Sequence, residues 1–294
     1  MVRFVGVLLS LCATCALVTA RADTSGADSV LARYPLNEDT FQQWKLPDKL
    51  DEISGLALSD DGRLLAMNDE QAIVYEIDYE EGRLIKSFAF GERRTLRDDF
   101  EGIAWFERRV YLVTSDGTLY VAHEGADGDR VPFETYSTGV GRDCEIEGLA
   151  TDRAEQELLL LCKRSVPGSD LSRPLIFRWS IRDRTIEWVR RIELPQSAIE
   201  DALGSAGLRP SGIAHALPEK HWLIVAVRQR AVIEIDNEGQ LVAARTLPLA
   251  DRHPQPEGIE LLADGRLVIA DEGRGGRARL TVYRPSRNNS MIER

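Results

Sequence analysis

One short phrase occurs five times in this chain, and its spacing constrains the fold more than any other feature. Each copy reads Ser or Glu, then Gly, then Leu or Ile, and opens a segment that alternates like a β-strand. The glycines of the copies are Gly55, Gly102, Gly148, Gly212 and Gly258. Successive copies lie about 46 residues apart, except for a longer interval between the third and the fourth, and such a period is typical of propeller blades.

Each repeat has room for one small four-stranded sheet. In the first repeat we expect strands at 53–58, 63–67, 72–77 and 83–88. The fifth repeat supplies only three strands, and the strand-like segment 41–46 would complete it. Because a ring closed by strands from both ends leaves no open sheet edge, we predict an all-β fold. It is a five-bladed β-propeller over residues 41–285, with the last blade closed by an N-terminal strand.

The third repeat is longer than the others for two reasons. A loop rich in Pro, Gly and Ser occupies 165–174, and segment 196–203, followed by Gly204, has the pattern of a short helix. We expect the outer strand of this repeat at 187–193.

The two ends of the chain have a different character. Residues 1–22 combine a basic Arg3, an apolar run and the small-x-small motif Ala20-Arg21-Ala22, which predicts a secretory signal peptide cut after Ala22. Residues 23–40 are expected to form a surface lead-in and 286–294 a flexible tail. No later apolar run could cross a bilayer. We therefore expect a periplasmic or secreted monomer with no transmembrane anchor.

The acidic charge of the chain bears on its partners. The formal net charge of −11 becomes −13 when the two arginines of the signal peptide are removed. Such a surface repels nucleic acid and anionic membranes, so neither is an expected partner. The excess acid either serves solubility alone or is gathered in part to hold a cation.

Two cysteines, Cys144 and Cys162, remain after the predicted cleavage. They flank one predicted hairpin, and an oxidising compartment would allow them to pair. A turn centred on Arg153 would place them face to face. Alignment with the other repeats centres the turn nearer Glu155, which separates them unless the strand contains a bulge. The sequence leaves both arrangements open.

The Ser/Glu position of the phrase is the main candidate for a functional site. In a propeller the inner strands start around one opening of the central channel, so Ser54, Glu101, Glu147, Ser211 and Glu257 should converge there. Carboxylates in one narrow opening repel one another, so either their pKa values rise or a cation lies among them. An all-oxygen donor set suits calcium, and the metal candidates are Glu101, Glu147 and Glu257. The alternative is that these carboxylates are merely solvated.

The ends of the second strands should add a further ring of charged residues to the same opening. Candidate additional ligands are Asp116, Asp271 and Glu272, and candidate anion contacts are Lys163, Arg164 and Arg228. The simpler interpretation is that the basic residues neutralise neighbouring acids. Catalytic residues remain unknown, because the histidines have no metal-ligand spacing and no nucleophile elbow or phosphate loop occurs.

The phrases as a set resemble those of the SdiA-regulated family, also called YjiK-like or CarP-like. The resemblance covers about residues 41–285 and is carried by Phe100-Glu101-Gly102-Ile103, Ile146-Glu147-Gly148-Leu149 with Leu161-Cys162-Lys163, Pro210-Ser211-Gly212-Ile213 and Gln255-Pro256-Glu257-Gly258-Ile259. It implies a five-bladed propeller related to NHL-repeat propellers, with calcium bound through Glu101, Glu147 and Glu257. The chain is more loosely similar to esterase-like phytase propellers. It departs from the expected pattern at Val227-Arg228-Gln229, which leaves open what the fourth blade contributes.

Three functions are compatible with these features. The first is an exported calcium-binding propeller that acts as a binding or signalling module in calcium-linked responses of the cell envelope, with an unknown small molecule or protein as its ligand. The second is a calcium-dependent hydrolase of phosphate esters or lactones that uses the same opening. The third is a protein–protein scaffold that needs no metal. The fold alone does not choose among them.

Overall fold

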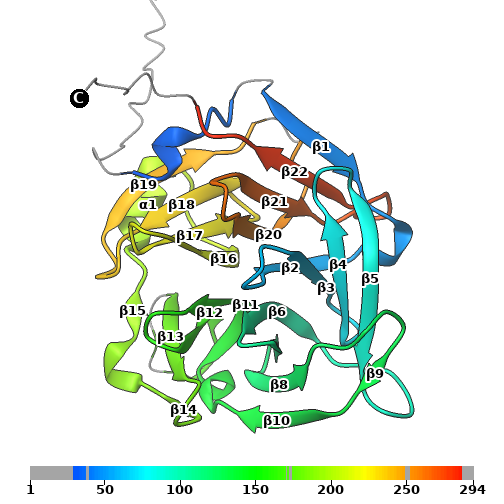
Figure 1. The fold of residues 1–294 in the computed structure, drawn as a ribbon. Coiled ribbons are helices and arrows are strands. Elements are labelled where there is room, and N and C mark those ends of the chain that lie inside the picture. The colour runs from blue at the N-terminus through cyan, green and yellow to red at the C-terminus, as the bar shows by residue number, and fades with distance from the viewer. Residues whose placement is uncertain (1–28, 38–39, 170, 172–173, 249–251, 287–294) are drawn as a thin grey trace, which may run out of the picture.

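Five small antiparallel sheets surround a common axis in the computed structural model of the protein, as the repeat predicts (Figure 1). The structure describes residues 29–37, 40–169, 171, 174–248 and 252–286. The predicted signal peptide and most of the predicted tail lie outside the described residues. The inner strands of neighbouring blades contact one another around the whole ring, which confirms the five-bladed propeller.

The first two blades follow the predicted four-strand plan closely, each listed from the axis outwards. Blade one contains β2 (Ile53–Leu58), β3 (Leu64–Asn68), β4 (Ile73–Asp78) and β5 (Arg83–Phe90), with the short β9 (Arg130–Val131) parallel to β5. Blade two contains β6 (Phe100–Phe106), β7 (Arg109–Thr114), β8 (Thr118–His123) and β10 (Phe133–Ser137).

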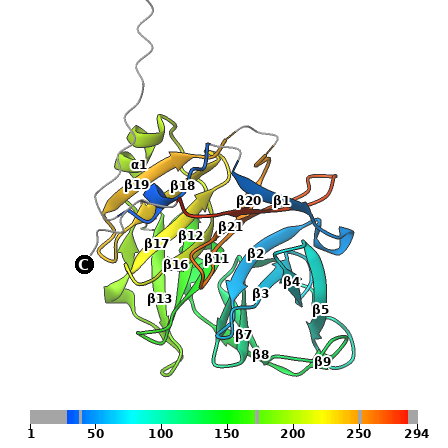
Figure 2. The same ribbon diagram turned by 45° about the horizontal axis from the view of Figure 1, so that its top comes forward.

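The last two blades have the same plan. Blade four contains β16 (Pro210–Ala216), β17 (His221–Ala226), β18 (Ala231–Ile235) and β19 (Leu241–Thr246). Blade five contains β20 (Pro256–Leu261), β21 (Leu267–Asp271), β22 (Arg279–Tyr283) and the N-terminal β1 (Phe41–Lys45). Phe41 pairs with Tyr283 and Lys45 with Arg279, so the two ends of the chain close one sheet. Figures 1 and 2 both show the blue β1 alongside the red β22.

Blade three departs from the prediction in its outer strand. Its first three strands, counted from the axis, are β11 (Cys144–Asp152), β12 (Glu157–Ser165) and β13 (Leu175–Ser180). The single strand expected at 187–193 is wrong. Two short strands, β14 (Thr185–Ile186) and β15 (Ile192–Glu193), pair with the two ends of β13, and a 3-10 turn, η4 (Trp188–Arg190), separates them. The predicted helix is confirmed as α1 (Gln196–Leu203), which ends at Gly204 in the left-handed conformation.

The repeated phrase forms the same β-bulge in each blade. Phe100 pairs with Thr114 and Gly102 with Val113, so Glu101 is the extra residue without a cross-strand partner. Register shifts also fall at Ser54, Ser211 and Glu257, and across 146–149 in blade three. A bulge bends the strand and re-aims one side chain. The Ser/Glu position is therefore the one residue per blade that the sheet releases toward the channel.

The glycine of the phrase is required by the close approach of the inner strands. A Cβ on Gly102 would lie 2.6 Å from the Leu149 nitrogen, and a Cβ on Gly212 would lie 2.5 Å from the Glu257 carbonyl oxygen. Both neighbours are backbone atoms of the next blade, which cannot move aside without shifting a strand. The glycine repeated in every copy of the phrase thus reflects packing at the axis.

The segment that was expected to form a surface lead-in is partly buried. Val30, Leu31, Tyr34 and Leu36 belong to a core cluster with residues of blades four and five. The fully buried Glu234 carboxylate accepts hydrogen bonds from Ser29 Oγ at 2.7 Å and from the Val30 and Leu31 N–H groups at 2.8 and 3.0 Å. These bonds fix the 3-10 turn η1 (Leu31–Arg33) against blade four. The lead-in prediction failed here because Glu234 supplies partners that local sequence does not reveal.

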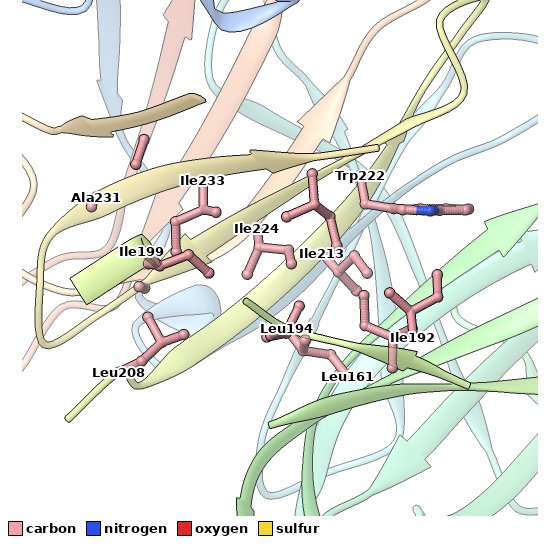
Figure 3. Packing of buried hydrophobic residues seen from close by; sticks show 14 of the residues in the cluster. Leu161, Ile192, Leu194, Ile199, Leu208, Ile213, Trp222, Ile224, Ala231 and Ile233 are labelled. Carbon is pink, nitrogen blue, oxygen red and sulfur yellow. The ribbon is translucent and has the colours of Figure 1, made fainter. Parts of the chain in front are cut away.

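Apolar side chains fill the spaces between blades. Between blades three and four, Leu161 and Ile192 pack with Ile213, Ile224 and Trp222 (Figure 3). Helix α1 adds Ile199 to the same cluster. Among the described residues, no helix is long and apolar enough to cross a membrane.

Candidate functional site

The five bulge positions gather at one opening of the central channel. A narrow cavity of about 10 Å³ is lined there by Ser54, Glu101, Glu257 and the glycines of the phrase. We call this opening the acidic mouth and define it by Ser54, Glu101, Glu147, Ser211 and Glu257 together with Lys163. A cavity of this size holds about one water molecule or small ion. Leu or Ile residues of the phrase, such as Ile103 and Leu149, are buried and line the channel just below.

The three glutamates of the acidic mouth influence one another. Burial, then the charges of Glu147 and Asp99, raise the pKa of Glu101 to about 9. Burial and the charge of Glu147 raise the pKa of Glu257 to about 8. At neutral pH these two side chains are therefore mainly protonated unless a cation compensates them. The convergence expected from the sequence is what produces this repulsion.

Glu147 is set apart from the other two by a lysine. Its Oε1 accepts a short hydrogen bond from Lys163 Nζ, and this ammonium also lies 3.8 Å from Glu145. Glu147 is 6% exposed, and its Oε2 has no hydrogen-bond partner in the described structure. Burial raises the pKa of Glu147, while Lys163 opposes the rise. Burial lowers the pKa of Lys163, but Glu147, Glu101 and Glu145 together raise it and the net shift is upward, so Lys163 stays an ammonium.

The two serines are part of the same hydrogen-bond network. Ser54 Oγ lies 3.4 Å from Glu101 Oε2 and donates weakly to it. Ser211 is 2% exposed, and its hydroxyl donates to the Pro256 carbonyl at 2.8 Å. Ser211 also lowers the pKa of Glu257, against the stronger effect of burial. Both hydroxyls thus lie within reach of a glutamate of the acidic mouth.

The donor set of the acidic mouth fits a calcium ion in its chemistry, because it consists of carboxylate and hydroxyl oxygens. The unpartnered Glu147 Oε2 is a buried acceptor that a cation would satisfy. In the part of the chain that the structure describes, however, no three His, Cys, Asp or Glu side chains are arranged as a ready metal cage. Lys163 already supplies one positive charge to Glu147. Binding would therefore require the carboxylates and Lys163 to rearrange.

The further acidic candidates lie in three different environments. Asp116 is in the exposed turn after β7, where it accepts hydrogen bonds from Thr114 Oγ1 at 2.6 Å and the Thr118 N–H at 3.0 Å. Glu272 accepts from Gln255 and is half-buried near the acidic mouth, where its charge raises the pKa of Glu257.

Asp271 is fully buried at the end of β21, where it pairs with Pro256, the residue before Glu257. It contacts His253 Nδ1 at 2.7 Å, and His253 Nε2 contacts the Tyr283 hydroxyl at 2.7 Å. This chain of hydrogen bonds ties the loop before β20 to two strands of blade five. Asp271 therefore has a structural partner here, and its contribution to a metal site stays a prediction.

The three basic candidates do not form one anion site. Arg164 follows Lys163 in β12 and is the more exposed of the two, and it pairs with Glu145. Arg228 is exposed in the turn between β17 and β18, beside Gly207 of blade four. Lys163 alone faces the acidic mouth, where it neutralises Glu147, as the simpler interpretation of the sequence expects.

The cysteines form a disulfide between β11 and β12. The Cys144 and Cys162 Cα atoms are 5.8 Å apart. Asp152 pairs with Glu157, so the hairpin turn centres near Glu155, and register shifts between Glu145 and Leu149 bring the cysteines together. The sequence did not decide whether a bulge brings the two cysteines together, and the structure contains that bulge. The bond joins Cys144, the residue before Glu145, to β12 and fixes the bulged end of β11. It is compatible with an exported protein.

Sequence reasoning missed two acids near the acidic mouth, Asp99 and Glu145. The charge of Asp99 raises the pKa of both Glu101 and Glu147, and Glu145 is shared by Lys163 and Arg164. Each lies two residues before a phrase glutamate, and this spacing in two blades was the signal that could have revealed them.

Comparisons with known proteins identify the fold. No family model matches the chain, and no curated protein sequence matches it. The structure is similar to a glutaminyl cyclase of Myxococcus xanthus, with a TM-score of 0.56 and 14% identity over 83% of this chain and 94% of that one. It is also similar to a luciferin-regenerating enzyme, with a TM-score of 0.54 and 8% identity over 83% and 95% of the two chains.

A third similar structure is a structural genomics protein of unknown function from Bacteroides thetaiotaomicron. The TM-score is 0.51 at 16% identity, and the match covers 89% of this chain and 62% of that one. At these identities the similarity shows a shared β-propeller fold and nothing about the chemistry of this chain.

Proposed function

We propose that the protein is an exported calcium-binding β-propeller that acts as a binding module in the cell envelope. The observation that carries the proposal is the convergence of Glu101, Glu147 and Glu257 on one narrow opening that contains a single ammonium. Burial and the repulsion of neighbouring carboxylates raise the pKa of all three carboxyls. A divalent cation would replace the missing positive charge and satisfy the unpartnered Glu147 Oε2.

The resemblance to the SdiA-regulated family supports the same assignment and stays an expectation. Glu101, Glu147 and Glu257 would hold the ion, with the Ser54 and Ser211 hydroxyls close enough to assist. Bound calcium would supply a fixed positive charge at the channel opening, where an anionic group of a partner could bind. The chain's own residues position the carboxylates through the bulges and through the disulfide between β11 and β12.

A calcium titration of thermal stability tests the proposal. For metal-free protein, calcium at about 100 times its Kd should stabilise the fold by about 2.7 kcal/mol, because the ion binds the folded state alone. The melting temperature should then rise by roughly 5–10 °C in a chain of this length. Glu101→Gln and Glu257→Gln should reduce the rise, while the exposed Glu238→Gln, in a turn of blade four, serves as the matched control.

Two results would count against the proposal. The first is an unchanged melting temperature at calcium concentrations on the order of 10 mM, above the Kd of weak extracellular calcium sites. The second is an equal response of Glu101→Gln, Glu257→Gln and Glu238→Gln, which would locate the ion elsewhere.

A second candidate function is a calcium-dependent hydrolase of phosphate esters or lactones. Glu101 and Glu257 favour it, because carboxyls whose pKa is raised to about 9 and about 8 can serve as general acids at neutral pH. Phosphate-ester and lactone panels test it. Hydrolysis that persists unchanged in both Glu→Gln variants would place any catalysis away from the acidic mouth.

A further inference from the structure

The far end of the channel contains a larger cavity that the acidic mouth does not use. It has a volume of about 440 Å³ and lies where the five inner strands end, whereas the acidic mouth lies where they begin. Pockets of roughly 300–1,000 Å³ commonly bind small organic molecules. Ile103 and Leu149 line both spaces, so an apolar collar separates them. We call this space the far cavity.

Aliphatic side chains cover much of the wall of the far cavity. Leu58, Ile103, Leu149 and Leu261 come from four different blades and face the same space. Leu217, at the turn after β16, is 48% exposed at its rim. An exposed leucine beside an apolar wall leaves hydrophobic surface that a ligand could cover.

His215 places unused hydrogen-bonding groups in this wall. Its ring stacks on Trp222 with centroids 4.1 Å apart, and the Arg178 guanidinium lies 5.8 Å from the centre of the Trp222 ring. Burial lowers the pKa of His215, so the imidazole is neutral and offers one donor and one acceptor. Neither ring nitrogen has a partner of acceptable geometry in the described structure, although the Thr151 backbone lies nearby. Unpaired buried polar groups are costly unless water or a ligand meets them.

The charged groups around the far cavity are already balanced. Arg153, from blade three, reaches across to blade one, where it pairs with Asp60 and donates to the Leu58 carbonyl at 2.7 Å. Arg33 pairs with Glu219. Burial raises the pKa of Glu260 to about 7, so this carboxyl is about half ionised at neutral pH, and its charge interacts with that of Arg153. Among the described residues of this wall, a charged ligand would therefore find no unpaired counter-charge, while a carbonyl or hydroxyl group would find the His215 ring.

From this wall chemistry we infer that the far cavity binds a small uncharged organic molecule with an apolar body and an amide, carbonyl or hydroxyl head group near His215. The apolar body would cover the leucines, and the head group would engage the His215 ring. The inference does not depend on calcium, because the apolar collar separates the far cavity from the acidic mouth.

Isosteric probes of different charge test this inference on the mature protein in a chelator. Cyclohexanecarboxamide should bind with a Kd on the order of 1 mM in calorimetry or ligand-observed NMR, as a small ligand of this size allows. Cyclohexanecarboxylate and cyclohexanecarboxamidinium should bind at least about tenfold more weakly, because neither charge is compensated.

Two variants and one control test whether the carboxamide binds in the far cavity. Ala263→Trp, at an exposed rim position, should abolish it by filling the far cavity, whereas Val189→Trp introduces the same side chain at a 95% exposed site on blade three and should have no effect. His215→Phe keeps the stack on Trp222 and should weaken carboxamide binding about three- to tenfold through loss of one hydrogen bond. Circular dichroism and the melting temperature establish that each variant is folded.

Three results would overturn the inference. If none of the probes binds, the far cavity is only hydrated. If binding is unchanged in both Ala263→Trp and His215→Phe, the probe occupies another site. If either charged isostere binds as tightly as the carboxamide, the uncharged ligand class is wrong.

Discussion

At the scale of single residues, two adjacent positions of the phrase have opposite constraints. The Ser/Glu position is released from the sheet by the bulge, so its identity can vary between blades without changing the fold. The following glycine is fixed by backbone atoms of the next blade. The side chain at the Ser/Glu position can therefore differ from blade to blade, while packing requires glycine at the next position.

This contrast predicts graded effects of Gly→Ala substitutions. Gly102→Ala places a Cβ 2.6 Å from the Leu149 nitrogen and should lower the free energy of unfolding by about 1–3 kcal/mol. In Gly55→Ala the new Cβ lies 3.2 Å from the Ile103 Cγ2 side-chain atom and 3.4 Å from the nearest backbone atom, the Ile103 nitrogen, so this substitution should cost distinctly less. Urea denaturation measures both, and an equal loss in the two variants would contradict the packing explanation.

The sequence predicts the residues of the acidic mouth only in part. Glu101, Glu147 and Glu257 could be grouped because they recur at one position of a repeat. The pairing of Lys163 with Glu147, and the burial of Asp271 against His253, depend on strand register and on loop residues outside the repeat. No repeated pattern in the sequence predicts those two contacts.

At the scale of elements, the strands that follow the repeat were predictable and the exceptions were not. The four-strand plan and the closure by β1 follow from the count of strands. The divided outer strand of blade three and the docking of η1 both arise from tertiary partners, β13 and Glu234. Local patterns carry no information about such partners.

The docking of η1 predicts a local effect of Glu234→Ala. Loss of the buried carboxylate leaves the Val30 and Leu31 N–H groups without an acceptor, at a cost on the order of 3 kcal/mol. Hydrogen exchange at these two amides should accelerate more than exchange in β16–β18. The exposed Glu238→Ala is the matched control. Unchanged protection of Val30 and Leu31 would show that η1 is held by its apolar contacts alone.

At the scale of the whole molecule, the ring concentrates titratable groups at its axis and thereby couples stability to pH. Glu101 and Glu257 have pKa values raised to about 9 and about 8, far above the value near 4.5 of an exposed glutamate. Between pH 7 and 9 the unfolded chain has already released these protons, while the folded protein still retains part of them. Because the folded state binds more protons, its stability falls as the pH rises.

Metal-free protein should therefore lose stability from pH 7 to 9, by up to about 1.4 kcal/mol per pH unit for each proton retained. The lowered pKa of His215 affects stability only below the ordinary histidine range, but Glu260, with a pKa raised to about 7, adds to the slope near pH 7. The slope between pH 8 and 9 therefore reports on the acidic mouth. Urea denaturation across this range measures the slope, and a Glu101→Gln, Glu257→Gln double variant should flatten it. A wild-type slope equal to that of the double variant would mean that these carboxyls are ionised in the folded protein, and the repulsion proposed to recruit a cation would be absent.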